Sequence, residues 1–163
     1  ISKKINLLKN IRHESNEIPS QINASISNIL FMFENDMNIS NRYKFFNSYA
    51  KVYIIFNQSL NDSLKTSKNV TRFKQTLIED VNNLISNSEI INSNDLNILF
   101  DNLKDIDVIY PGVGSNLDFI TKYSSEKNVN INYIYRKEDL INWNYAKSGY
   151  FKFKSKFYLV NNL

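Results

Sequence analysis

Residues 106–120 read "IDVIYPGVGSNLDFI" and combine three local signals in one segment. A short apolar run is stopped by Pro111 and Gly112, as at the end of a β-strand. The residues after Gly114 then have the composition of a helix start. A strand, a glycine turn and a helix in this order also present backbone N–H groups to an anion. The segment therefore predicts a strand–turn–helix unit, and it could be either a structural turn or a ligand-binding loop.

Glycine is rare in this chain, which makes the pair in this loop informative. Two of the three glycines in 163 residues are Gly112 and Gly114. Two glycines so close together indicate a backbone requirement, either a positive φ or a close approach to another group. Ser115 or Asn116 is expected to cap the following helix. The candidate ligand-binding residues are therefore Gly112, Gly114, Ser115 and Asn116.

The nine residues "VIYPGVGSN" resemble the first loop of Rossmann-like methyltransferases and of some nucleotide-sugar-dependent transferases. The resemblance implies a nucleotide, a nucleotide-sugar or S-adenosylmethionine as ligand of the Pro111 to Asn116 loop. However, Leu117 stands where the dinucleotide fingerprint has its third glycine. Residues 135–137, Tyr-Arg-Lys, stand where an acidic residue would hold a ribose. About three β-like segments are also too few for a doubly wound cofactor domain. We therefore predict a structural turn, with the ligand loop as the alternative, and expect these ligands not to bind.

Apolar side chains before residue 105 recur mostly at helical spacing. They predict about five helices, at residues 5–11, 22–33, 41–65, 70–85 and 96–103. The segment 41–65 is expected to be the central buried helix, because its apolar stripe is accompanied by further apolar residues on its other side. The expected core residues are Phe46, Tyr53, Phe56, Phe73, Leu77 and Val81.

After residue 104 the apolar pattern changes to the short runs and the period of two that are typical of strands. About three strands are expected, at residues 106–110, 128–135 and 150–160, the last with lysines on a solvated edge. The predicted fold class is α+β: a mainly helical N-terminal part, residues 1–104, packed with a small β-containing C-terminal part, residues 105–163. We expect one domain. Because the chain begins with Ile1 rather than Met, it is expected to be processed, or to be a piece or subunit of a longer protein.

Composition excludes several kinds of chemistry. The chain has no cysteine, which excludes disulfides, thiolate metal sites and a cysteine nucleophile. His13 is the only histidine and is expected to be exposed, so neither a zinc site nor a Ser-His-Asp triad is predicted. Asp118 alone cannot assemble a two-metal nuclease site. No catalytic residue, metal ligand or cofactor is therefore assigned, and the compartment stays open.

Partners are constrained only weakly by the sequence. The formal net charge is +4, but Lys and Arg are scattered, which gives little support to nucleic-acid binding. The sequence contains no run of about 18 apolar residues, so no transmembrane segment is predicted. Trp143, Tyr145 and Tyr150 form an aromatic group in a polar segment, as at sites that anchor a partner protein. We expect a soluble, non-enzymatic protein-interaction module. The alternative is the ligand-binding part of a Rossmann-like transferase.

Overall fold

The computed structural model describes residues 24–39, 42–143 and 154. The chain divides into two compact units, of which one is Ile22–Arg136 and the other combines Ile1–Gln21 with Lys137–Leu163. Helix α7 (Lys137–Trp143) belongs to the second unit, and all other elements below belong to the first. Within the described residues, no helix has both the length and the apolar composition needed to span a membrane. Whether the chain is a single domain stays a prediction.

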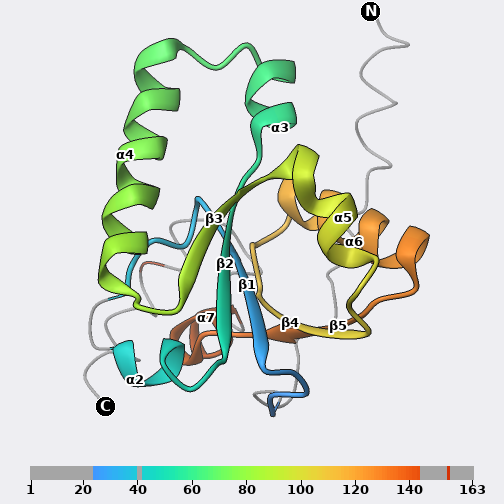
Figure 1. The fold of residues 1–163 in the computed structure, drawn as a ribbon. Coiled ribbons are helices and arrows are strands. Elements are labelled where there is room, and N and C mark those ends of the chain that lie inside the picture. Colours follow the sequence, from blue (N-terminus) through green and yellow to red (C-terminus); the bar gives the residue numbers. More distant parts are fainter. Residues whose placement is uncertain (1–23, 40–41, 144–153, 155–163) are drawn as a thin grey trace, which may run out of the picture. The chain divides into compact units, whose positions relative to one another are not determined.

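The first unit is built on a sheet of five parallel strands in the order β3-β2-β1-β4-β5 (Figure 1). The strands are β1 (Ile29–Phe33), β2 (Lys51–Phe56), β3 (Ser88–Asn92), β4 (Asp105–Ile109) and β5 (Asn130–Ile134). Parallel strands need crossover connections, and helices provide them here. They are α2 (Tyr43–Phe46), α3 (Gln58–Ser63), α4 (Lys68–Leu84), the 3₁₀ turn η1 (Ser93–Asp95) with α5 (Leu96–Phe100), and α6 (Ser115–Lys127).

Different helices cover the two faces of the sheet (Figure 1). On one face, α4 packs against alternate residues of the central strands, and this core includes Leu30, Met32, Val52, Ile54, Ile78, Val81 and Ile85. On the other face, α5 and α6 pack against the intervening residues, and that core includes Phe31, Phe33, Ile55, Leu96, Phe100, Val108 and Ile120. Each fully buried side chain of this size contributes roughly 1.5–3 kcal/mol to stability. The fold is therefore a doubly wound α/β sheet.

The predicted α+β class, with helices before residue 105 and strands after it, is wrong. Three of the five strands, β1, β2 and β3, precede residue 105. The predicted helices 22–33 and 41–65 contain β1 and β2 respectively. Both strands are buried on their two faces, so their sequences "ILFMF" and "KVYIIF" are apolar almost without interruption. Such a run has no period of two, and its apolar residues also satisfy helical spacing.

Other elements agree with the sequence prediction. Helices α4 and α5 and strands β4 and β5 lie where apolar spacing predicts them. Helix α4 begins after Ser67, whose Oγ accepts a hydrogen bond from Val70 N–H. The predicted helix 5–11 lies outside the described residues. So does the predicted strand 150–160, except for Lys154, which is helical and exposed.

The predicted core is correct in part. Phe46, Phe56 and Val81 are buried. Tyr53 and Leu77 are half-buried. Phe73 is 68% exposed, which contradicts the prediction. Helix α4 has an apolar stripe wider than the surface that it buries, and Phe73 lies on the part of the stripe that does not face the sheet.

Candidate functional site

The strand order defines one position on the sheet where a ligand would bind. From β1 the chain continues to β2 and then β3, and it returns to place β4 on the other side of β1. The loops that follow β1 and β4 therefore leave the carboxyl edge in opposite directions. In open parallel sheets, ligands bind outside the carboxyl ends of the strands at this topological switch point. The loop of Pro111 to Asn116 follows β4, so it lies at this position.

The two glycines of this loop have conformations that other residues rarely adopt. Gly112 has φ 79° and Gly114 has φ 135°, as a glycine turn predicts. A Cβ atom added at either glycine would meet no atom of the described residues within 4 Å, so these residues leave open space beside both glycines. Two grooves of the described chain lie on the two sides of β3. The glycines therefore serve the turn itself and leave its outer side accessible.

Helix α6 begins without a side-chain cap. Its N-cap is Gly114, which has no side chain to accept a hydrogen bond from the first turn. The prediction that Ser115 or Asn116 caps the helix is therefore wrong, because the helix already begins at Ser115. The first N–H groups of a helix have no partner within it, and the helix dipole adds partial positive charge at this end. The start of α6 thus offers N–H donors next to the glycine loop.

Side-chain amides tie the loops at this edge together. Asn35 Nδ2, after β1, donates to the carbonyl oxygen of Pro111 over 2.7 Å. Asn57 Nδ2, after β2, donates to Asn116 Oδ1 over 2.9 Å. Asn57 Oδ1 accepts from Leu60 N–H and so caps α3 as well. The predicted site residue Asn116 therefore contacts a residue from another strand end.

A buried carboxylate follows β1 directly. Glu34 is 6% exposed, and its Oε1 lies 3.5 Å from Lys74 Nζ of α4. Its Oε2 accepts a hydrogen bond from Asn57 N–H over 3.3 Å. Lys74 also donates to Asn61 Oδ1 over 2.9 Å. A buried carboxylate requires such partners, because desolvation of an unpaired charge is costly.

A second buried carboxylate lies two residues further along. Asp36 is 5% exposed, and its Oδ1 lies 3.0 Å from Arg136 and 3.5 Å from Arg42. Arg136 follows β5, so this ion pair joins loops from two strands of the sheet. Asp36 Oδ2 is buried and accepts no hydrogen bond from the described residues. Such a buried acceptor without a partner among the described residues is unusual and marks this strand end as a place where a further donor is expected.

Two aromatic side chains lie next to the glycine loop, at the ends of β4 and β5. Tyr110 lies between the end of β4 and Pro111, and its ring centroid lies 4.8 Å from that of Tyr135, which follows β5. Both rings are half-buried. Burial raises the pKa of the Tyr135 phenol, and the neighbouring Tyr110 and Tyr133 add to the shift. The Tyr135 phenol therefore stays neutral near pH 7, and the two rings present aromatic surface at the ends of β4 and β5.

A third buried carboxylate, Asp107, lies within β4 and has a different environment. It is fully buried, and its oxygens accept hydrogen bonds from Ser25 Oγ, Ile26 N–H, Tyr49 Oη and Asn132 Nδ2. Burial raises the pKa of Tyr49 to about 12, and the Asp107 carboxylate adds to that shift. Because its donors satisfy it, Asp107 holds the segment that enters β1 and is not part of the candidate ligand site.

The aromatic group proposed for partner binding is described only in part. Trp143 is the last residue of α7 and is half-buried. Tyr145 and Tyr150 lie outside the described residues. His13 does too. No group of three or more His, Cys, Asp or Glu suited to a metal ion occurs among the described residues.

Sequence reasoning misses the polar residues at the strand ends, namely Glu34, Asn35, Asp36, Asn57 and Arg136. Each follows a buried apolar run within three residues, in "ILFMFEND", "KVYIIFN" and "NYIYR". The signal is present, but it has meaning only once the runs before residue 105 are recognised as parallel strands, whose carboxyl ends share one edge.

The fold and this edge define a class, the doubly wound α/β proteins with a polar switch point. No protein-family model matches the chain, and neither a curated protein nor a solved structure matches it.

Proposed function

We propose that the chain binds a small ligand of the nucleotide type at the carboxyl edge of its sheet, between the loops that follow β1 and β4. The class comprises nucleotides, nucleotide-sugars and S-adenosylmethionine. The strand count that favoured a simple turn in the sequence no longer opposes this function, since the sheet has five parallel strands.

One observation carries the proposal. The buried polar and charged residues of the described chain are Glu34, Asp36, Asn57, Asn61, Ser93, Asp107 and Asn132. The first five follow the ends of β1, β2 and β3, whereas only Asp107 and Asn132 lie inside strands. Burying polar groups is costly unless they are paired. Their concentration at one edge indicates a surface organised for polar recognition.

The ligand class follows from three features of neighbouring strand ends. The N–H groups at the start of α6, after β4, suit a phosphate or carboxylate. Asp36 Oδ2, after β1, suits a hydroxyl or amino donor. Tyr110 and Tyr135, after β4 and β5, suit a flat ring. Neighbouring strands lie about 4.8 Å apart, so β1 to β5 spans about 10 Å, roughly the extent of a nucleoside.

Thermal unfolding in the presence of each ligand class tests the proposal. A ligand at one hundred times its Kd stabilises the fold by about 2.7 kcal/mol. The decisive variant is Ser115→Pro, because proline is tolerated at the first position of a helix and removes one N–H donor there. Ser115→Ala is its matched control, since it keeps the N–H group.

We expect at least one ligand to stabilise the wild type and Ser115→Ala equally, and Ser115→Pro much less. If no ligand of the three classes raises the temperature of unfolding, the proposal is contradicted. An equal shift in both variants would place binding elsewhere. Asp36→Asn provides a second check, because it keeps the size of the side chain and an oxygen acceptor but removes the charge. The shift that the ligand adds, measured against the ligand-free variant, should become smaller.

A second function, the protein-interaction module expected from the sequence, is favoured by a different observation. At the outer edge of the sheet, Ile90 is 37% exposed and Ile98 is 76% exposed. A cluster of exposed apolar side chains next to an open strand is typical of a surface that binds another polypeptide. Saturable binding of another polypeptide to the purified chain tests this function, and the effect of Ile98→Lys on that binding tests whether this surface carries it.

A further inference from the structure

The outer edge of β3 is open within the described part of the chain. β3 pairs with β2 on one side, and no described strand pairs with its other side. Val52 N–H donates to Asn87 O over 3.0 Å. In a parallel ladder, alternate residues bond to the same neighbour, so Glu89 and Ile91 point their backbone groups to β2. The backbone N–H and C=O groups of Ile90 therefore point outward.

This edge lacks several of the features that usually protect an exposed strand, and its one charged residue, Glu89, pairs with Lys51 of β2. Proteins prevent unwanted pairing with prolines, lysines or bulges on edge strands. The sequence of β3 is "SEIIN", without proline or lysine, and its pairing with β2 is continuous over five residues. An additional strand could therefore pair with it without rearrangement.

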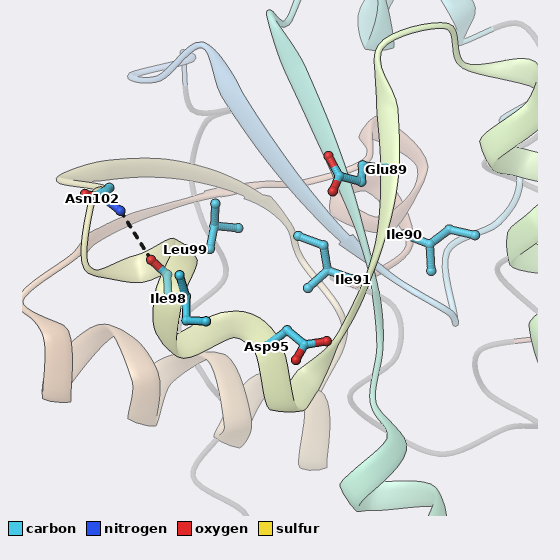
Figure 2. A pocket seen from close by; sticks show the side chains of 7 residues that line it. All are labelled: Glu89, Ile90, Ile91, Asp95, Ile98, Leu99 and Asn102. Atoms are coloured by element: carbon cyan, nitrogen blue, oxygen red, sulfur yellow. Dashed lines mark hydrogen bonds between the residues drawn. The ribbon is translucent and has the colours of Figure 1, made fainter.

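A groove lies on each side of β3. The groove on the side of α5 has a volume of about 390 Å³ and is lined by Ile91, Ile98 and Leu99 among others. Figure 2 shows Ile91 directed toward α5, and Ile90 directed to the opposite side of the strand. The groove on the side of α4 has a volume of about 260 Å³ and includes Phe56, Ile78 and Ile90. Successive side chains of an added strand point to opposite faces, so they would enter these grooves alternately.

The acidic side chains that line the two grooves favour a particular kind of partner. Their ionisable lining residues are Glu79, Glu89 and Asp95, which are all acidic, although the whole chain has a formal net charge of +4. Glu89 pairs with Lys51 over 2.7 Å. In contrast, Glu79 and Asp95 form no ion pair with described residues. Complementary charge favours a partner with basic side chains.

We propose that the outer edge of β3 binds an extended peptide segment of a partner protein, in which apolar residues accompany Lys or Arg. The backbone of the segment pairs with Ile90, its apolar side chains fill the grooves, and its cations lie near Glu79 and Asp95. This binding mode is strand addition to an open sheet edge. The inference rests on the second proposed function and names its surface and its partner class.

The probe is a synthetic peptide with the repeat Ile-Ile-Lys-Lys, which places both Ile and Lys on each face of an added strand. It is titrated into the full chain and compared with a peptide in which Glu replaces Lys. We expect the Lys peptide to bind and the Glu peptide to bind at least about tenfold more weakly. Asp95→Lys should reduce this preference or reverse it. Glu126→Lys makes the same charge change on α6, where the exposed Glu126 pairs with Lys122 and lines neither groove, and should leave the preference unchanged.

A second pair of variants tests the groove itself. Ile98 is largely exposed, so Ile98→Lys should fold normally and weaken the Lys peptide about tenfold. Leu84→Lys is its control, because Leu84 is 56% exposed at the end of α4 and does not line either groove. A Lys peptide in which alternate backbone amides are methylated cannot pair with β3 and should not bind.

Three outcomes would overturn the inference. The first is equal binding of the Lys and Glu peptides by the wild type. The second is equal weakening by Ile98→Lys and Leu84→Lys. The third is a dimer in light scattering that Ile98→Lys converts to a monomer, which would make a second copy of the chain the occupant. If another polypeptide binds equally to the wild type and Ile98→Lys, only the surface is wrong and the interaction function stands.

Discussion

Asn35 Nδ2 donates a hydrogen bond to the carbonyl oxygen of Pro111 over 2.7 Å, and this bond joins the loop after β1 to the loop after β4. The two residues are 76 positions apart in the chain. They meet because β1 and β4 are neighbours in the sheet. The bond holds together the two loops that diverge at the switch point, where the proposed ligand would bind.

Replacing the loop glycines should lower stability to different extents. Gly112 at φ 79° lies in the left-handed region, where alanine costs about 1–2 kcal/mol. Gly114, at φ 135° and ψ −164°, has a conformation that is essentially restricted to glycine, so Gly114→Ala should cost up to about 3 kcal/mol. Urea denaturation measures both losses. An equal, negligible loss in the two variants would show that the loop adopts another conformation.

The same substitution to alanine should have very different effects on stability at two phenylalanines. Phe56 is 3% exposed, so Phe56→Ala should lower the free energy of unfolding by about 3–5 kcal/mol. Phe73 is 68% exposed on α4, and Phe73→Ala should change it by no more than about 0.5 kcal/mol. Denaturant titration of both variants checks the prediction. A large loss for Phe73→Ala would mean that this face of α4 is covered in solution.

Because the pKa of Tyr49 is raised in the folded chain, stability should fall at alkaline pH. The unfolded chain releases the phenol proton near pKa 10.0, whereas the folded chain retains it to about 12. Between these values the folded state binds more protons, so the free energy of unfolding falls as the pH rises. Tyr49→Phe should remove this part of the pH dependence, while that of Tyr133 and Tyr135 remains. Parallel curves for both proteins from pH 8 to 12 would contradict the raised pKa.

Breaking the ion pair of Lys74 and Glu34 should lower the free energy of unfolding more than breaking an exposed ion pair. Lys74→Met leaves the buried Glu34 carboxylate without its cation and should cost about 1–3 kcal/mol. Adding Glu34→Gln should recover part of this loss, because the unpaired charge is then removed. Lys122→Met is the control, since Lys122 and Glu126 are both exposed, and should cost less than about 1 kcal/mol. Denaturation at low and high salt separates the two pairs, because only the exposed pair is strongly screened.

The β–α–β segment formed by β4, α6 and β5 could be predicted from the sequence alone. Its signals are local: an apolar run, a proline, two closely spaced glycines, and a second run with a period of two. The amphipathic spacing of α4 is local as well. Such features depend on backbone preferences within a few residues, which do not need tertiary contacts to be recognised.

Strands β1 and β2, and with them the sheet, were decided by tertiary structure. A strand covered on both faces needs apolar residues at every position, and this removes the alternation that distinguishes it from a buried helix. Packing also decided which part of the apolar stripe on α4 is buried, Ile78 rather than Phe73. The sequence by itself determined the glycine turn. Only the order of the strands brought Glu34, Asp36, Asn57 and Arg136 to the edge where that turn lies, because residues so distant in the chain meet only through strand pairing.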